Sequence, residues 1–468
     1  MSVKNTHPDY DNSLPDILMA RDFYLGERVV KGKETTYLKP TVAQVLDGMG
    51  KNDKGRATYE KYIEGARFPD LFKQAVENTL GVMHGEDPVI QVPKKMEPIL
   101  QKISRKGETV YGLLRRINEE QLISGRLGVL LDIDENTDLP YISMFDAEYV
   151  INWDEGILES GTVANLKMVV LHEPKTTLDS ELQWTTKEMY RICILSGDES
   201  GNSVYQTGVF EDTFDSTQLR PVQLIGKSLE KIPFVFINTK DSLTKPDLPP
   251  FIGLVNEVLG IYRSEANYRY HLYMQSQDTL VRIGHMRTIE NENETVRTGA
   301  GAVLDVSIGG DAKFIGVNSQ GLTEERLALE NDYKRAEAIA LKLLDKKSSE
   351  SGEALIARKD SQTASITQIA KTSCAALETI LKMMAEWMSL NPDEVIVTPF
   401  TEFGDTTITA RDVVDMRTAK TMGAPISNET IHELMREGGL TDKTFDEELA
   451  AIAKEDDVPA RTGTNDNL

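Results

Sequence analysis

Two short stretches carry residues in the order that phosphate or calcium sites use. Gly226-Lys227-Ser228 matches the end of a phosphate-binding loop, but the loop's first glycine would stand at Pro221. Proline has no backbone N–H to donate to a phosphate, so the sequence predicts no nucleotide site there. Asp132 and Asp134 begin a calcium-loop pattern that lacks the central glycine and the final glutamate that such a loop needs. An acidic turn before Pro140 is the prediction.

Two glycine-containing stretches suggest turns instead of catalysis. Residues 197–201 read Gly-Asp-Glu-Ser-Gly, one residue off the pattern that presents a nucleophilic serine, and a hairpin tip is expected there. Residues 297–301 carry a lone glycine pair with no helix after it, and a turn is again expected. We predict no catalytic residue and no cofactor.

Histidine and cysteine spacing gives no metal-site pattern. The chain contains no H-x-x-x-H or C-x-x-C spacing among its six histidines and two cysteines: His7, His84, His172, His271, His285, His432, Cys193 and Cys374. The two cysteines lie far apart in the sequence, which favours two buried free thiols and a reducing compartment. No metal is predicted.

Length and charge limit the classes of protein that remain. The chain has 468 residues, enough for two to four compact regions, with 40% apolar and 27% charged residues. It has neither a run of about 20 apolar residues nor the basic-then-apolar order of a signal peptide, so no membrane association is expected. A net charge of −23 argues against a protein that grips nucleic acid, but not against one that lets it pass.

Apolar spacing predicts helices, then strands, then helices again. Residues 10–125 have helical stripes, including one over 110–122 that ends at Gly125. Short β-branched or aromatic runs then predict strands: GVLLDID, PYISMFD, EYVINW, LKMVVLH, EMYRICIL and IPFVFIN. Three long helices are expected over 251–282, 324–344 with Thr323 as the cap, and 353–390. Between the first two, AVLDVSI and AKFIGV are expected to be small strands.

Several segments, in order, resemble portal proteins of tailed bacteriophages, the rings through which double-stranded DNA enters and leaves the capsid. The resemblance covers more than 400 residues and rests on these segments: RDFYLGERVVKG, YLKP, YEKYIEGARF, ISGRLGVLLDID, PYISMFDAEYVINW, KIPFVFIN with the helix after it, SESGEALIARKD and MGAPISNETIHELMREGGL. No single segment is as specific as a catalytic signature.

The resemblance implies an α+β portal fold in parts. These would be a mixed α/β wing (1–250), a first stem helix (251–283), a small β-containing clip (284–321), a second stem helix (322–344), a tunnel loop (345–352), a wing part with a long kinked helix and a strand (353–404) and a helical crown with a disordered tail (405–468). Family portals form twelve-subunit rings at one capsid vertex.

The stretch LDKKSSESGEAL interrupts two helical patterns where portals carry the tunnel loop. The resemblance makes its residues candidates to face DNA: Lys346, Lys347, Ser348, Ser349, Glu350 and Ser351. Serines and glycine give a flexible backbone, Ser351 can cap the next helix, and the lysine pair repeated around a ring could touch phosphates. A solvated loop whose lysines do nothing is the alternative. Further channel or clip candidates are Arg282, Arg287, Arg297 and Lys313.

The implied partners are other copies in a homododecamer, passing double-stranded DNA, the terminase large subunit, a head–tail adaptor, and the major capsid and scaffolding proteins. The implied location is the portal vertex of the virion, after assembly in the host cytoplasm. The resemblance implies no enzyme activity, because ATP hydrolysis would belong to the terminase. An acidic channel wall repels the phosphates of DNA and so favours passage over binding. This repulsion acts over only about 8 Å at physiological salt, so it does not prevent DNA from entering.

Two other readings remain open at this point. One is a soluble cytoplasmic α+β enzyme whose long helices pack internally, which would be a monomer or dimer with a pocket of convergent polar groups. The other is a different head–tail adaptor ring or a scaffold, although adaptors are usually much shorter than this chain.

Overall fold

The computed structural model describes residues 2–134, 137, 139–157, 164–197, 203–224, 227–275, 279–283, 309–315, 320–341, 352–401, 410–437 and 439–456. Over these ranges the fold is mixed α+β, as predicted, and divides into two compact units, Met1–Phe400 and Thr401–Leu468. No helix in these ranges is both long enough and apolar enough to cross a lipid bilayer.

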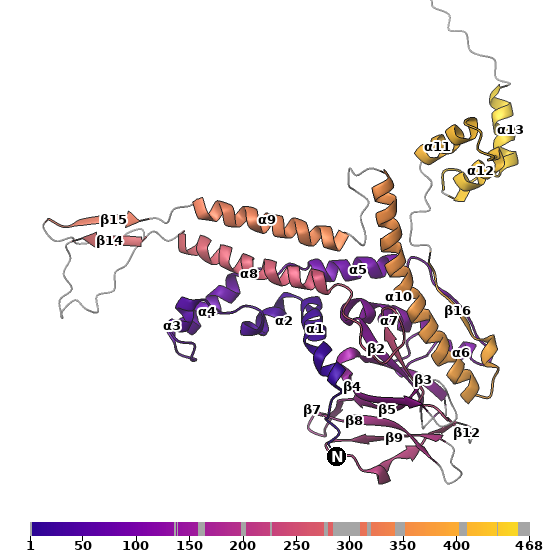
Figure 1. The fold of residues 1–468 in the computed structure, drawn as a ribbon, viewed down its shortest axis with the longest axis horizontal. Coiled ribbons are helices and arrows are strands. Elements are labelled where there is room, and N and C mark those ends of the chain that lie inside the picture. Colours follow the sequence, from indigo (N-terminus) through magenta and orange to yellow (C-terminus); the bar gives the residue numbers. More distant parts are fainter. Residues whose placement is uncertain are drawn as a thin grey trace, which may run out of the picture. The chain divides into compact units, whose positions relative to one another are not determined.

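Helices dominate the first part of the larger unit (Figure 1). They are α1 (Pro8–Leu25), α2 (Glu27–Gly32), η1 (Glu34–Thr36), α3 (Val42–Leu46), α4 (Lys54–Gly65), α5 (Leu71–Met83), α6 (Glu97–Leu100) and α7 (Val110–Ser124). The predicted end of α7 is confirmed: Gly125 has φ 78°, and a Cβ there would lie 2.7 Å from the Leu248 carbonyl oxygen. Thr109 accepts the Gly112 N–H at the other end of α7.

Two antiparallel sheets follow. The three-stranded sheet has the order β13 (Phe234–Asn238), β2 (Arg126–Asp134) and β3 (Leu139–Asp146). The short helix η2 (Ala147–Tyr149) leads to the second sheet, whose order is β10 (Arg220–Pro221), β9 (Ser203–Phe210), β8 (Tyr190–Gly197), β5 (Ala164–His172) and β4 (Val150–Ile157). All six predicted strands are therefore present, and β9 and β10 are additional strands of the second sheet.

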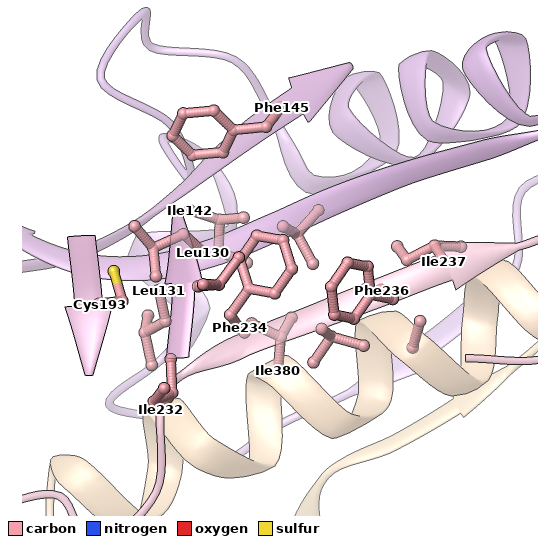
Figure 2. Close-up of a cluster of buried hydrophobic side chains, with 14 of the residues drawn as sticks. Leu130, Leu131, Ile142, Phe145, Cys193, Ile232, Phe234, Phe236, Ile237 and Ile380 are labelled. Carbon is pink, nitrogen blue, oxygen red and sulfur yellow. The ribbon is translucent and has the colours of Figure 1, made fainter. Parts of the chain in front are cut away.

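The main core lies between the three-stranded sheet and the long helix α10 (Gly352–Trp387). Figure 2 shows Ile380 of α10 beside Phe234 and Phe236 of β13. Gly128 on β2 leaves room for the Phe234 ring, because a Cβ there would lie 2.1 Å from its Cζ. Cys193 and Cys374 are buried and free, as predicted.

The stretches that resembled ligand loops lie in hairpins. Lys227–Ser228 forms strand β12, which pairs with β11 (Gln223–Leu224), so no helix begins at this lysine. Asp132 and Asp134 lie at the end of β2, in the hairpin with β3. The strands β8 and β9 pair out to Gly197 and Ser203, which confirms the expected hairpin. Residues 198–202 at its tip and residues 297–301 lie outside the described ranges.

Three long helices follow the sheets, with boundaries that differ from those predicted. Helix α8 spans Ile252–Gln275, about 36 Å at 1.5 Å per residue. The prediction that it continues to residue 282 is wrong, because β14 (Thr279–Ile283) pairs with β15 (Asp311–Ile315). Strand β15 confirms part of the AKFIGV prediction, whereas AVLDVSI lies outside the described ranges.

Helix α9 spans Gln320–Leu341, so Thr323 lies inside it and is not its cap. The predicted third helix is confirmed as α10, which ends before the short helix η5 (Pro392–Glu394). Strand β16 (Ile396–Thr398) then pairs with β1 (Val89–Gln91). The remaining elements are β6 (Lys175–Leu178), β7 (Trp184–Lys187), η3 (Ser216–Gln218) and, in the smaller unit, α11 (Ala410–Thr421), α12 (Asn428–Glu437) and α13 (Phe445–Asp456).

Candidate functional site

Helices α8 and α9 form an antiparallel pair whose two members differ in burial. The first two thirds of α8 pack against α1, α4 and α5 through a continuous buried stripe: Leu254, Val255, Val258, Ile261, Tyr262, Glu265 and Ala266. Beyond Ala266 no described side chain of α8 is fully buried, and His271, Leu272 and Tyr273 are exposed. The far part of α8 thus leaves the body of the unit in the company of α9.

Helix α9 is exposed along most of its length. Among its described side chains only Leu329 and Ala336 are buried. The helix carries five carboxylates and three basic side chains, and its outward side includes the exposed Leu327. A 22-residue helix with so little buried surface gains little stability from its own chain.

Polar contacts fix the register of the pair. Glu265 of α8 is buried and accepts hydrogen bonds from Arg269 Nε at 2.6 Å and from the Tyr333 hydroxyl of α9 at 3.3 Å. Burial and the nearby Glu265 raise the pKa of Tyr333 to about 12, so it stays protonated and able to donate. Further along, His271 Nδ1 lies 2.9 Å from Glu325 Oε1.

The β14–β15 hairpin joins these helices and holds two of the predicted clip residues. On the backbone register Arg282 pairs with Ala312, and Lys313 pairs with Val281. The two positions are therefore close in the hairpin. Arg287 and Arg297 lie outside the described ranges.

The predicted tunnel loop, residues 345–352, falls almost wholly between the last described residue of α9, Leu341, and the first of α10, Gly352. Its candidate DNA-facing residues, Lys346, Lys347, Ser348, Ser349, Glu350 and Ser351, all lie outside the described ranges. What the structure does describe is how the following helix is held.

A buried polar network holds α10 against α7, α5 and β13. Asn118 of α7 donates through Nδ2 to Ser373 Oγ of α10 at 2.8 Å and accepts from His84 Nε2 at 3.0 Å. Gln121, one turn further along α7, donates to the Asn238 carbonyl of β13 at 2.6 Å. Burial lowers the pKa of His84, so the neutral ring is the form that this network favours.

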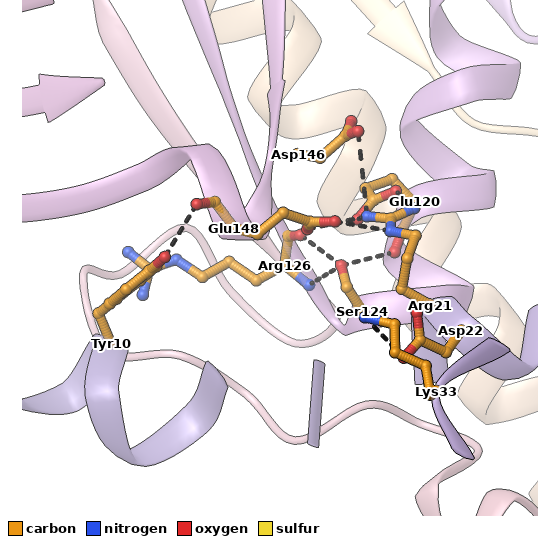
Figure 3. Close-up of polar contacts among 9 residues, drawn as sticks. All are labelled: Tyr10, Arg21, Asp22, Lys33, Glu120, Ser124, Arg126, Asp146 and Glu148. Carbon is orange, nitrogen blue, oxygen red and sulfur yellow. Dashed lines mark hydrogen bonds and ion pairs between the residues drawn. The ribbon is translucent and has the colours of Figure 1, made fainter. Parts of the chain in front are cut away.

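A second network joins the N-terminal helices to the sheet (Figure 3). Arg21 of α1 donates to Glu120 of α7, with Nη1–Oε2 at 2.7 Å, and to Glu148 of η2, with Nε–Oε1 at 2.8 Å. Burial would lower the pKa of Arg21, but the two carboxylates raise it overall. Burial raises the pKa of Glu120, and Arg21 offsets part of that rise. Because α1 contacts α8, this network supports the base of the helix pair.

Arg126 is a buried cation in an aromatic slot. Its guanidinium carbon lies 4.3 Å from the ring centroids of both Trp153 and Phe236. Within the described part of the chain its Nε and Nη2 have no hydrogen-bond partner, and burial lowers the pKa of Arg126 to about 9. The ring faces supply the electrostatic attraction that a carboxylate would otherwise provide.

The two thiols and the largest described groove have the following surroundings. Burial raises the pKa of the Cys374 thiol to about 12 and also raises that of Cys193, so neither is a thiolate at neutral pH. A groove of about 880 Å³ carries Arg105, Arg191 and Arg220, but Arg191 is already bonded to carboxylates. In the described ranges no three His, Cys, Asp or Glu side chains gather as a metal site would require.

Sequence reasoning missed both polar networks. Their partners are far apart in the chain: 99 positions separate Arg21 from Glu120, and 255 separate Asn118 from Ser373. The available signal was weak, namely polar residues within otherwise apolar helix faces.

A sequence family described as "Domain of unknown function (DUF4055)" matches residues 250–388. This range, less than a third of the chain, contains α8, β14, β15, α9 and α10. No curated protein matches the chain.

Similar solved structures include "Virion of native gene transfer agent (GTA) particle", with 14% identity, a TM-score of 0.38, and coverage of 84% of this chain and 96% of the other. "Neck of native GTA particle computed with C12 symmetry" has 12% identity, a TM-score of 0.35 and coverage of 85% and 98%. "Neck of empty GTA particle computed with C6 symmetry" has 11% identity, a TM-score of 0.37 and the same coverage. At these values the similarities assign neither a family nor a function to the chain.

Proposed function

We propose that this chain is the subunit of a portal-type ring at one vertex of a phage-like capsid, a passive conduit for double-stranded DNA during packaging and ejection. The observation that carries the proposal is the α8–α9 pair, two long helices that leave the body of the unit and are joined through a small β-hairpin. The order of α8, the β14–β15 pair, α9 and α10 along the chain supports the portal resemblance of the sequence.

Exposure of the pair supports assembly. With Leu329 and Ala336 as its buried side chains, α9 presents a long surface on which a neighbouring copy's pair could pack. Leu272 and Leu327 are apolar and exposed, and such a contact would bury them. Packing of this kind around an axis would surround a channel with helix pairs.

Charge supports passage over binding. Each subunit carries −23, and α9 has more carboxylates than basic groups. A wall of this kind makes few phosphate contacts, so DNA would be held weakly and with little salt dependence. In this proposal Lys346 and Lys347 would form a local basic ring inside a channel that is acidic elsewhere.

The proposal assigns partners by place in the ring. The β14–β15 end of the pair would form the clip, which meets the terminase large subunit during packaging and a head–tail adaptor afterwards. The wing would meet the major capsid and scaffolding proteins, and the smaller unit would form the crown. ATP hydrolysis would belong to the terminase.

Native mass spectrometry of the purified full-length chain tests the proposal. A species of about twelve copies is expected, with thirteen also compatible for a recombinant ring. If the chain stays monomeric or dimeric across a range of salt, co-expression with scaffolding and capsid protein is the next condition. A chain that forms no ring even then would contradict the proposal and favour the α+β enzyme reading.

A further inference from the structure

The β6–β7 hairpin is exposed on both of its faces. Every residue from 174 to 188 is exposed, including all eight residues of the two strands. Thr176 faces Thr186 and Thr177 faces Thr185, with hydroxyl oxygens 3.0 and 3.3 Å apart. A two-stranded hairpin without a covering layer is only marginally stable in water. Within its own chain, this hairpin has no packed layer that would stabilise it.

The end of this hairpin is apolar, and its turn is hydrogen-bonded. Leu178 and Trp184 are cross-strand partners, and Leu182 lies in the turn between them. Leu182 is 78% exposed and Trp184 is 69% exposed. Asp179 fixes the turn, since its Oδ1 accepts the backbone N–H groups of Glu181 and Gln183 at 2.9 and 2.8 Å. We call Leu178, Leu182 and Trp184 the hairpin tip.

The backbone at Leu182 has a strained, left-handed conformation. Its φ is 61°, in the left-handed region that glycine or asparagine adopts at much lower cost. A leucine at this position gives up folding stability and places a large apolar side chain in water. Both costs are offset if the Leu182 side chain is buried against another molecule.

A second exposed apolar patch lies on α3. Val42, Val45 and Leu46 are exposed, with Val42 at 77% and Leu46 at 82%. Thr41 and Gln44 stabilise the start of this short helix through a capping box with bonds of 3.4 and 2.8 Å. We call Val42, Val45 and Leu46 the α3 patch.

The charges around the two patches are complementary. The tip carries the carboxylates Asp179 and Glu181. The α3 patch is flanked by three exposed lysines, Lys39, Lys51 and Lys54, that form no ion pair with any residue the structure describes. Residues 39–54 have three lysines against two aspartates, so this stretch is slightly basic in a chain of net charge −23.

We propose that the hairpin tip of one subunit docks on the α3 patch of the neighbouring subunit, an inference that rests on the proposed ring. A ring needs two different, complementary surfaces on each copy, because each subunit meets one neighbour with one side and the next neighbour with the other. The tip alone is much smaller than a stable interface, so it adds to a larger contact between subunits.

Cross-linking of single-cysteine variants tests this docking. Leu182→Cys and Val45→Cys place thiols in the tip and the α3 patch, while the native cysteines are buried and react slowly. Mixing the two variant chains under ring-forming conditions and oxidising them is expected to give disulfide-linked dimers containing one chain of each kind. Replacing Val45→Cys with Gln101→Cys, an exposed position after α6, is the matched control.

The outcomes separate this inference from the proposed function. Rings without cross-links above the control overturn the docking and leave the ring intact. A chain that carries both Leu182→Cys and Val45→Cys and gives links only within itself also overturns it. If the unmodified chain forms no ring under any condition, the proposed function fails and the docking fails with it.

Leu182→Gly gives an independent readout. It removes the apolar contact and relieves the strained φ, so the thermal midpoint of the subunit is expected to stay the same or rise. The protein concentration at which half of the chains are in rings should rise about tenfold. Leu243→Gly, at an exposed leucine elsewhere, should leave that concentration unchanged. Unchanged assembly of Leu182→Gly would overturn the docking.

Discussion

Replacing Arg21 with alanine should strongly destabilise the larger unit. The guanidinium bonds to Glu120 and Glu148 and joins α1 to α7 and η2. The Arg21 and Glu148 side chains are each 17% exposed and that of Glu120 is 5% exposed. The variant therefore leaves two carboxylates in a poorly solvated place without their cation.

The expected loss follows from that burial. Removing one partner of a buried ion pair costs about 3–5 kcal/mol, because the remaining charge is neither hydrated nor paired. The loss should depend on pH. Burial keeps the native pKa of Glu120 above its unfolded value, and without Arg21 it rises further. The native state then binds a proton more readily than the unfolded state, so the deficit should be larger at pH 8 than at pH 5.

Urea unfolding followed by far-ultraviolet circular dichroism measures the effect. With a slope of about 3–4 kcal/mol per molar for a unit of this size, the midpoint should fall by about 1 M. Arg56→Ala is the matched control, since Arg56 also bonds to two carboxylates, Glu34 and Glu60, but does so at the surface. That variant should shift the midpoint much less.

A charge-free variant distinguishes lost pairing from lost packing. Arg21→Met combined with Glu120→Gln and Glu148→Gln removes the three closely bonded charges, keeps most of their volume and leaves the more exposed Asp146 in place. It should recover much of the stability that Arg21→Ala loses. If Arg21→Ala costs no more than Arg56→Ala, or if the triple variant is worse than the single one, the buried-charge reasoning is refuted.

Three further predictions address other parts of the chain. His84→Gln should make the free energy of unfolding less dependent on pH between 5 and 7. Burial lowers the native pKa of His84 below its unfolded value, so the wild type loses stability as the pH falls through about 6.5. Gly128→Ala should cost about 1–3 kcal/mol in thermal unfolding because its Cβ meets a buried ring, whereas Gly81→Ala, in open space on α5, should add about 0.5–1 kcal/mol. Replacing Lys346 and Lys347 with glutamine should leave ring assembly unchanged and lower the salt dependence of DNA retention; an unchanged salt slope would favour a loop that does not touch DNA.

Local signals were sufficient where a segment's structure depends on its own residues. The stripe over 110–122 with Gly125 after it predicted α7, because the glycine can adopt the left-handed conformation that ends a helix. The β-branched runs predicted β2 and β13, which are buried on both faces and so have little polar alternation.

Local signals failed where the partner is distant. Thr279–Ile283 continued the apolar stripe of α8 and was predicted as helix, but its structure is set by pairing with Asp311–Ile315, about 30 residues later. The β6 and β7 strands, with their run of threonines, show no apolar alternation and were missed. The networks around Arg21 and Asn118 could not be predicted, because each forms only when helices far apart in sequence pack together.

Electron cryomicroscopy of the assembled protein would show how the subunits are arranged. A portal-type ring should have about twelve subunits, with the α8–α9 pairs around a central hole and the β14–β15 hairpins together at one end. A closed monomer or dimer in which α9 is covered by its own chain would contradict it. So would a ring whose hole is lined by the sheets while the helix pairs point outward.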